Sequence, residues 1–219
     1  PEEAEPRFEE SIEVMTKAFV SRERFSHRGK FWQFDDIVVE PPPAQQPHPP
    51  FWVAAGSDAS IRRAAQRGLN LILDQYASPE VLSQRIALYR AERLASGLRG
   101  PARIAVARQA YVANDRADAE ATLARQAEWN RRTVAVSRAP DGKTGSHILS
   151  YAATPQGTEA SALYGTPDEI SRMLQALQAA GVEYVILTIL GGKQQLRRFA
   201  REVMPAFSGQ RAAQKAEVP

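Results

Sequence analysis

The chain has 219 residues, of which 43% are hydrophobic and 24% are charged. These proportions are typical of a soluble globular protein with one sizeable core or two smaller ones. It contains no cysteine and only three histidines, which excludes disulfides, iron–sulfur clusters and thiol catalysis and leaves little for a zinc site. The net charge of +3 comes from arginines scattered along expected helices rather than from a basic tract, so we expect no nucleic-acid partner.

No apolar run approaches the ~20 residues that a membrane-spanning helix needs, and the first residues lack the charged and apolar regions of a signal peptide. We therefore expect a cytoplasmic protein that has no membrane contact and no bound metal. The chain begins at Pro1 without a methionine and enters an expected helix within a few residues, so we also expect further chain before it.

The first fifty residues predict a helix, a hairpin and an extended segment. Apolar residues recur on one helical face between Pro6 and Val20. Residues Gly29–Phe34 alternate like a hairpin strand, for which Ile37–Val39 is the candidate partner. The segment Pro41–Pro50 contains six prolines, which remove hydrogen-bond donors and fix φ, so it is expected to be an extended lead-in.

Four apolar strands alternate with helices over the rest of the chain. The expected strands are Phe51–Ala55, Leu69–Leu73, Ile104–Val112 and Val182–Leu190. The expected helices cover about 58–67, 78–97, 114–136 and 166–181, and a last helix ends at Pro205. Strands that alternate with helices imply a parallel sheet, either doubly wound or part of a TIM barrel. A complete barrel needs eight such units over ~250 residues, so the pattern fits half a barrel.

The most informative segment is the turn that follows the first of these strands. Gly56 permits a close backbone approach to a ligand, and Ser57 and Ser60 place hydroxyls beside unpaired N–H groups at a helix start. Such a turn favours an anionic group such as a phosphate. Ser57 or Asp58 can equally act as a helix cap, which helices require with or without a ligand.

Four other features carry open alternatives. The segment 138–165 lacks periodicity and contains turn residues, which predicts either a covering loop that includes His147 or a disordered segment. Arg108, in the middle of an apolar strand, either lines the interior or has a structural role, and the structural role is favoured. His48 precedes a strand and is expected to be structural. Lys193 follows the last strand and is a candidate either to neutralise an anion or simply to begin a helix.

Several blocks of sequence, taken in their order and spacing, strongly resemble the bacterial luciferase-like monooxygenases. These blocks are Arg7–Val14, Gly29–Trp32, Pro43–Ala54, Gly165–Glu169 and Ala180–Val182. The family consists of flavin-dependent TIM-barrel oxidoreductases that use reduced FMN or the deazaflavin F420. The resemblance covers nearly the whole chain.

The resemblance implies that residues 1–207 are the carboxyl-terminal half of a TIM barrel, strands five to eight, and that residues 208–219 are a flexible tail. It assigns the flavin phosphate to the loop after the fifth strand, so the cofactor-binding residues are expected to be Ala55, Gly56, Ser57 and Ser60. The catalytic residues stay unknown, because the first four strands normally supply most of them.

The implied function is that of a flavin-dependent monooxygenase acting on a small organic substrate with dioxygen and FMN, or alternatively with F420. A flavin reductase that supplies reduced flavin and a second copy in a homodimer are the implied partners. The resemblance also implies that this chain is incomplete for catalysis. Two other functions are left open: a non-catalytic half-barrel that acts as an assembly partner, and a phosphate-binding barrel hydrolase or isomerase.

Overall fold

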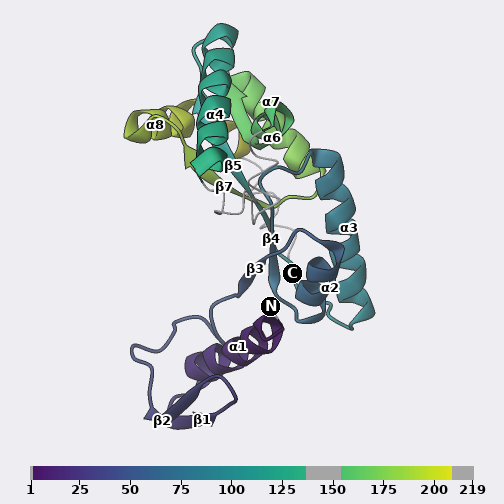
Figure 1. Cartoon of the computed structure of the whole chain (residues 1–219), viewed down its shortest axis with the longest axis vertical. Helices are drawn as coiled ribbons and strands as arrows, with labels where there is room; N and C mark the ends of the chain where they lie inside the picture. The colour runs from purple at the N-terminus through teal and green to yellow at the C-terminus, as the bar shows by residue number, and fades with distance from the viewer. Residues whose placement is uncertain (1, 137–153, 209–219) are drawn as a thin grey trace. The chain divides into compact units, whose positions relative to one another are not determined.

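The computed structural model describes residues 2–136 and 154–208, without the side chain of Pro155. His147, most of the expected covering loop and the expected tail beyond Ser208 lie outside the described residues. The chain divides into two compact units, residues 1–51 and 52–219 (Figure 1). In the described parts of both units, no helix has the length and apolar character that a bilayer span requires.

The first unit contains the helix α1 (Ala4–Val20) and an antiparallel hairpin of β1 (Phe25–Arg28) and β2 (Gln33–Ile37). The expected hairpin is therefore present, but the expected pairing of Gly29–Phe34 with Ile37–Val39 is wrong. Glu10 on α1 gives the reason, because its carboxylate accepts the N–H groups of Phe31 and Trp32 at 3.0 and 2.7 Å. These bonds hold residues 29–32 as the connection between two strands rather than as a strand.

The second unit is built on a parallel sheet. Its strands in the described residues are β3 (Trp52–Ala54), β4 (Asn70–Leu73), β5 (Ile104–Val112), β6 (Ala162–Gly165) and β7 (Tyr184–Ile189). β3 pairs with β4 and β4 with the first part of β5, while β7 pairs along β5 from Ala105 to Ala110. β6 pairs with the last part of β5. The four expected strands are thus observed as a parallel sheet, together with a fifth that the sequence did not predict.

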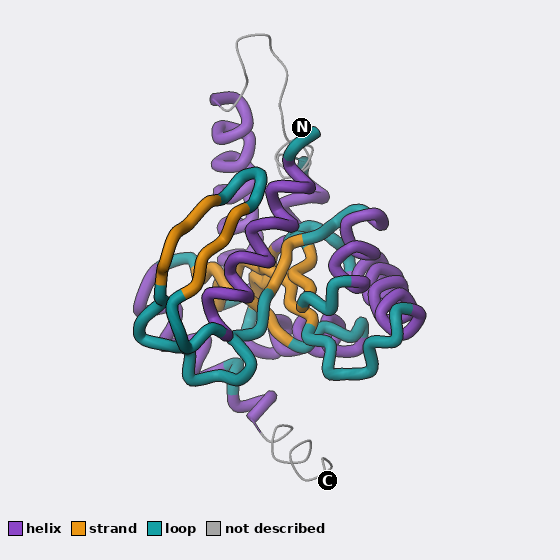
Figure 2. Tube along the Cα trace, turned by 90° about the horizontal axis from the view of Figure 1, so that it is seen from below, coloured by secondary structure: helices purple, strands orange, loops and turns teal. Residues whose placement is uncertain are grey.

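Helices pack against this sheet (Figure 2). The described helices of this unit are α2 (Asp58–Gln66), α3 (Pro79–Ala95), α4 (Arg116–Val136), α6 (Pro155–Ser161), α7 (Pro167–Ala179), α8 (Gly192–Glu202) and α9 (Pro205–Ser208). Residues of α2, α3, α7 and α8 join the strands in the buried core. The last part of the segment 138–165, expected to lack structure, instead forms α6 and β6. Thr154 caps α6 through the N–H of Gly157 at 3.0 Å, and β5 is long enough to pair with β6 beyond the end of β4.

The two faces of the sheet differ in burial. On β5, the alternate residues from Ile104 to Val112 are at most 3% exposed and belong to the face that packs against helices. Strand register places the other set of residues on the opposite face, and that set includes Trp52, Ala107, Gln109 and Ile186. Parts of this face are open to solvent, since Tyr184 is 39% and Ile186 49% exposed.

The face opposite the helices is concave. Trp52 on β3 and Tyr184 on β7 lie at the two sides of the strand order β3-β4-β5-β7, yet their rings meet edge to face with centroids 5.5 Å apart. In a flat sheet, three strand spacings of about 4.8 Å would separate the two strands by roughly 14 Å. The sheet must therefore curl toward this face, which we call the concave face, as strands in a barrel do.

Candidate functional site at the carboxyl ends of the strands

The turn after β3 begins as a continuation of the sheet. The N–H of Ala55 donates to the carbonyl of Ile72 on β4 at 3.0 Å, and Ala55 is 8% exposed. Ala55 is thus a backbone-anchored member of the core, between the exposed Ala54 and the partly exposed Gly56. This fixes the start of the turn at the carboxyl end of the parallel strands, the edge where α/β proteins bind ligands.

Ser57 and Ser60 form a reciprocal capping box at the start of α2. Ser57 Oγ accepts the Ser60 N–H at 3.3 Å, and Ser60 Oγ accepts the Ser57 N–H at 3.2 Å. The two hydroxyls also lie 2.9 Å apart. The capping role of Ser57 foreseen from the sequence is confirmed, and the hydroxyls of both residues point toward one spot at the helix start.

Two backbone donors at this helix start have no acceptor among the described residues. The helical ladder begins with the N–H of Ile61, which donates to Ser57 at 2.9 Å, and the N–H of Ser60 is used by the cap. The N–H groups of Asp58 and Ala59 precede the ladder and remain unpaired, as the first N–H groups of any helix do. They carry the positive end of the helix dipole.

Gly56 is not required by the backbone. Its φ lies outside the left-handed region, and a Cβ built on it would meet only Asp74 Oδ2, at the ordinary contact distance of 3.5 Å. The structure thus gives no conformational reason for glycine here. Its effect is to leave the turn without a side chain on the side that Asp74 faces.

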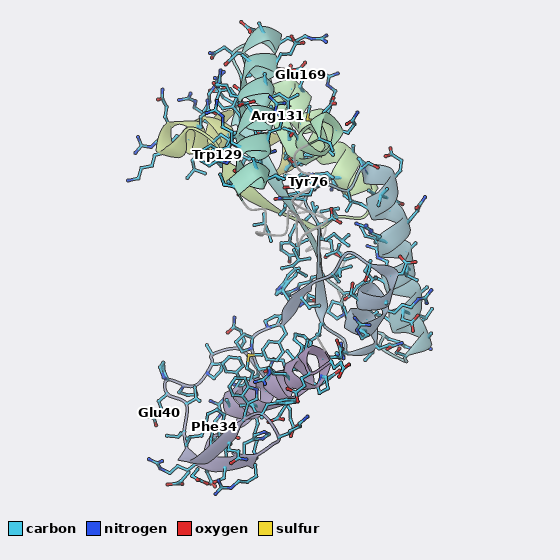
Figure 3. The ribbon with its side chains drawn as sticks, viewed as in Figure 1. Phe34, Glu40, Tyr76, Trp129, Arg131 and Glu169 are labelled. Atoms are coloured by element: carbon cyan, nitrogen blue, oxygen red, sulfur yellow. The ribbon has the colours of Figure 1, made fainter. Side chains whose placement is uncertain are left out.

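Asp74 follows β4 directly and brings charge to the turn. Its Oδ2 forms an ion pair with Arg85 Nη1 of α3, and its Oδ1 accepts the N–H of Tyr76 at 2.9 Å. Tyr76 lies in the same loop (Figure 3), where burial raises the pKa of its hydroxyl. Neither Asp74 nor Arg85 was predicted from the sequence as a site residue, although a carboxylate immediately after a buried strand is a signal for this edge of a sheet.

Arg108 stabilises the loop between β4 and α3 through hydrogen bonds. It is 3% exposed, and its guanidinium donates to the carbonyls of Gln75 and Ala77 at 2.9 and 2.6 Å. Burial lowers the pKa of Arg108 to about 10, while Asp74 acts in the opposite direction. The favoured structural role of Arg108 is confirmed, because its donors replace the strand pairing that β4 no longer provides beyond Leu73.

A second polar group lies where β5 meets β6. Tyr164 donates its hydroxyl to Gln109 Oε1 at 2.6 Å. Its ring stands edge to face with that of Tyr111 at 6.5 Å, and Tyr111 donates to Asp118 of α4 at 3.2 Å. Burial raises the pKa of Tyr164 well above its usual range. Neither Gln109 nor Tyr164 was predicted from the sequence as a site residue.

The other residues singled out in the sequence each have a local role or position. His48 belongs to the first unit, where its ring stacks on Phe51 at 4.6 Å. Lys193 is exposed in the first turn of α8, after β7. Thr166 and Glu169 form the capping box that the sequence predicts for α7.

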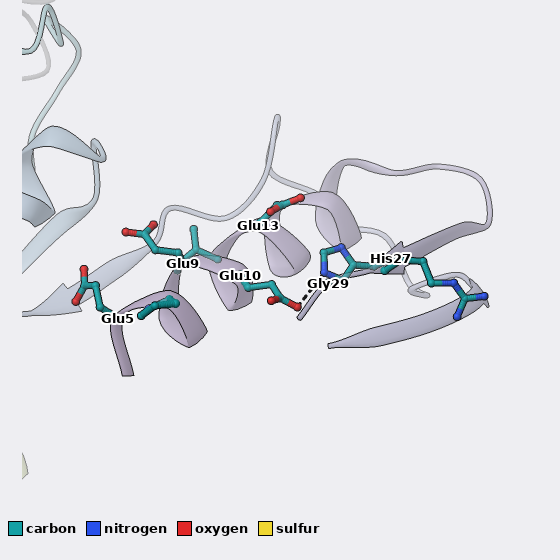
Figure 4. Close-up of a pocket in the computed structure, with 9 residues that line it drawn as sticks. Glu5, Glu9, Glu10, Glu13, His27 and Gly29 are labelled. Atoms are coloured by element: carbon teal, nitrogen blue, oxygen red, sulfur yellow. Dashed lines mark hydrogen bonds and ion pairs between the residues drawn. The ribbon is translucent and has the colours of Figure 1, made fainter. Parts of the chain in front are cut away.

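An open acidic pocket in the first unit is lined by Glu5, Glu9, Glu13 and His27 (Figure 4). Glu10 Oε1 lies 3.3 Å from His27 Nε2 and also accepts the N–H of Trp32 in the hairpin connection. Among residues 2–136 and 154–208, no three His, Cys, Asp or Glu side chains are grouped as a metal ion would need.

The fold and this edge define an α/β protein with a concave parallel sheet and a turn suited to an anionic ligand group. Residues 1–184 match the family described as luciferase-like monooxygenase. The chain therefore belongs to the luciferase-like monooxygenase family, and the resemblance noted in the sequence is confirmed.

The chain is 28% identical over 205 residues to the oxygenase component of the flavin-dependent trigonelline monooxygenase of Acinetobacter baylyi, covering 84% of this chain and 56% of the relative. It is 26% identical over 223 residues to the FMNH2-dependent dimethylsulfone monooxygenase of Pseudomonas putida, covering 91% and 57%. The crystal structure of the monooxygenase RslO1 from Streptomyces bottropensis superimposes with a TM-score of 0.70 at 24% identity, covering 94% of this chain and 62% of that one. The chain thus spans little more than half the length of the curated relatives it matches.

Proposed function

We propose that the protein is a flavin-dependent monooxygenase of the luciferase-like family and that the turn Ala55–Ser60 binds the phosphate of its flavin. The observation that carries this proposal is the family match over residues 1–184, together with a turn at the carboxyl strand ends whose first helical N–H groups are unpaired. A phosphate at a helix start satisfies such donors and interacts favourably with the helix dipole.

The residues of the turn fit a phosphate by their donors. The N–H groups of Asp58 and Ala59 and the hydroxyl of Ser57 would donate to it, and Gly56 would let it approach the backbone. The hydroxyl of Ser60, which donates to the Ser57 carbonyl at 2.8 Å, would turn its proton to the phosphate. The carboxylate of Asp74 would repel an anion, but its ion pair with Arg85 offsets that charge. Bound reduced flavin supplies the chemistry that activates dioxygen, while the protein orients the ring and keeps water away.

We propose FMN as the cofactor, with F420 as the alternative, and a small organic molecule as the substrate. The printed name of the dimethylsulfone relative, FMNH2-dependent, supports reduced FMN. The trigonelline relative is named as an oxygenase component, which supports a separate flavin reductase as a partner. A homodimer is proposed from the family resemblance.

We also propose that residues 1–207 form the carboxyl-terminal half of a TIM barrel and that the chain is incomplete for catalysis without the other half. The curl of the sheet, brought out by the Trp52–Tyr184 contact, supports this. Within the described residues, β3 pairs only with β4 and β7 only with β5, so each has a side on which a further strand could pair.

The proposed function is tested by titrating the purified protein with FMN, F420 and riboflavin and following the flavin absorbance and fluorescence. Saturable binding of FMN that is tighter than that of riboflavin, which lacks the phosphate, is the expected result. Absence of binding to both FMN and F420 would overturn the proposal. Tighter binding of F420 than of FMN would make F420 the proposed cofactor and would leave the proposed phosphate site unchanged.

A further inference from the structure

A hydrogen bond joins Gln109 and Tyr164 on the concave face. Gln109 lies on β5 in register with Thr188 of β7 and Ala162 of β6. Its neighbours Arg108 and Ala110 belong to the buried face, so Gln109 belongs to the concave face. Tyr164 on β6 is 7% exposed and bonds to Gln109 Oε1 at 2.6 Å.

In this bond the Tyr164 hydroxyl is the donor and the Gln109 carbonyl is the acceptor. Because burial raises the pKa of Tyr164, the hydroxyl keeps its proton and continues to donate.

This bond fixes the orientation of the Gln109 carboxamide. With the oxygen turned toward Tyr164, the nitrogen lies at the other end of the amide plane, and its two N–H donors have no acceptor among the described residues. Gln109 is half-buried, and its register partner Thr188 is exposed. Holding a half-buried amide in one orientation costs side-chain entropy. A bound acceptor would form hydrogen bonds with its N–H groups without a further cost of this kind.

The surroundings suit a flat heteroaromatic ring. Tyr111, two residues along β5 on the same face, is half-buried, and Ile186 and Thr188 on β7 are exposed beside Gln109. β4 separates β5 from β3, so Gln109 lies on the order of 10 Å from the Gly56 turn. Gln109 must therefore contact a part of the ligand other than the phosphate.

We propose that Gln109 binds the flavin ring by donating a hydrogen bond to a ring carbonyl or ring nitrogen, and that Tyr164 is the positioning residue that orients its amide. The inference rests on the proposed function, since it requires a flavin. It adds a residue of this chain that recognises the ring rather than the phosphate.

The first test replaces Gln109 by Leu, which keeps the size of the side chain and removes its donors. Binding of FMN and of riboflavin is expected to weaken by the same factor, about 3- to 10-fold, as for one lost hydrogen bond. Loss of a donor to the ring also disfavours the electron-rich reduced flavin, so the reduction potential of bound FMN should fall. The matched control is Gln175→Leu, at an exposed position of α7, which should change neither quantity.

The second test replaces Tyr164 by Phe, alone and together with Gln109→Leu. If Tyr164 acts by orienting Gln109, Tyr164→Phe should weaken the binding of FMN and of riboflavin by the same factor, smaller than that of Gln109→Leu. In the double variant it should have no further effect on either affinity. The single variant Gln109→Leu leaves the buried Tyr164 hydroxyl without its acceptor. The double variant removes both partners of the bond and so has no such unpaired group.

The outcomes separate this inference from the function on which it rests. If the unchanged protein binds no flavin, the proposed function fails. If it binds FMN and riboflavin, and Gln109→Leu leaves both affinities and the reduction potential unchanged, the inference on Gln109 is wrong while the function stands. Independent, additive losses in the double variant would overturn the positioning role of Tyr164.

Discussion

Trp52 and Tyr184 meet edge to face at 5.5 Å although their strands lie at opposite sides of the β3-β4-β5-β7 order. The contact is possible only because the sheet curls, and it stabilises that curl in turn. Edge-to-face aromatic pairs contribute about 0.5–1.5 kcal/mol beyond the area they bury.

We therefore expect Trp52 and Tyr184 to be energetically coupled. In a double-mutant cycle with Trp52→Leu and Tyr184→Leu, the coupling in the free energy of unfolding should be about 0.5–1.5 kcal/mol. Urea denaturation measures it. Trp52→Leu combined with Ile186→Ala, a neighbour on the same face of β7, serves as the comparison. A coupling of zero for the Trp52–Tyr184 pair would mean that the ring contact does not persist in solution.

Ser57 and Ser60 have a structural role as a cap, so their replacement must affect stability as well as any ligand. Ser57→Ala with Ser60→Ala should cost about 1 kcal/mol of stability, which lowers the melting temperature by about 2–4 °C for a chain of this size. FMN binding should also weaken about tenfold, while riboflavin binding stays unchanged.

Thr166→Ala is the matched control for this pair. It removes a cap of the same type from α7 and should lower the melting temperature by a similar amount without changing the ratio of FMN to riboflavin affinity. If the two serine replacements also leave that ratio unchanged, Ser57 and Ser60 are caps only.

The variant Gly56→Ala tests whether glycine is needed here for the approach of a ligand or for the conformation of the backbone. The φ of Gly56 suits an alanine, and the added Cβ would meet Asp74 at an ordinary contact distance. Stability should therefore stay the same or rise by up to about 1 kcal/mol, because alanine restricts the unfolded chain. If the phosphate touches this backbone, FMN binding weakens and riboflavin binding does not. A clear loss of melting temperature would show that the glycine is needed by the fold instead.

The sequence predicted the elements whose signals are local. The apolar runs of β3, β4, β5 and β7 and the caps at Ser78 and Thr166 are each readable from a few consecutive residues, and each is observed. β6, Ala162–Gly165, escaped prediction because it ends in a glycine and directly follows a segment without periodicity, so its short apolar run does not stand out. It is a strand because β5 extends beyond β4 and offers a free ladder to pair with.

The site was only partly predictable for a related reason. The turn at Gly56–Ser60 is contiguous and carries its own chemistry. By contrast, Tyr164 and Gln109 are 55 residues apart and meet only through the register of two strands. The pairing of Asp74 with Arg85 likewise depends on the path of the loop between β4 and α3. No local pattern specifies such long-range pairs.

Glu10 should make the first unit sensitive to acid. Burial acts to raise the pKa of this carboxyl, but the N–H donors of Phe31 and Trp32 and the neighbouring His27 outweigh burial and lower it. A carboxyl with a lowered folded-state pKa stabilises the fold above its unfolded-state pKa, near 4.5, and loses that contribution as the pH falls through the folded-state value.

The difference in unfolding free energy between the unchanged protein and Glu10→Gln should therefore be largest near neutral pH and shrink as the pH falls below about 4.5. Urea denaturation at a series of pH values measures it. Glu13→Gln, on an exposed position of the same helix, provides the control. A difference that is constant with pH would contradict the ionised Glu10 carboxylate as the acceptor of the hairpin donors.

Arg108 should be among the most important polar residues for stability in the second unit. Replacement by Met keeps the apolar stem but leaves the carbonyls of Gln75 and Ala77 without their donors. Each unsatisfied buried group costs about 1–3 kcal/mol, so we expect a loss of about 2–5 kcal/mol in urea denaturation. Arg108→Lys should recover only part of this, because one ammonium cannot reproduce the forked geometry of a guanidinium.

Arg99→Met, at an exposed position before β5, is the control and should cost less than about 0.5 kcal/mol. Because the same guanidinium fixes the loop that carries Asp74 beside Gly56, Arg108→Lys should also weaken FMN binding more than Arg99→Met does. Equal, small losses of stability for Arg108→Met and Arg99→Met would show that the carbonyls of Gln75 and Ala77 find other donors. The loop that carries Asp74 beside the Gly56 turn would then not depend on β5.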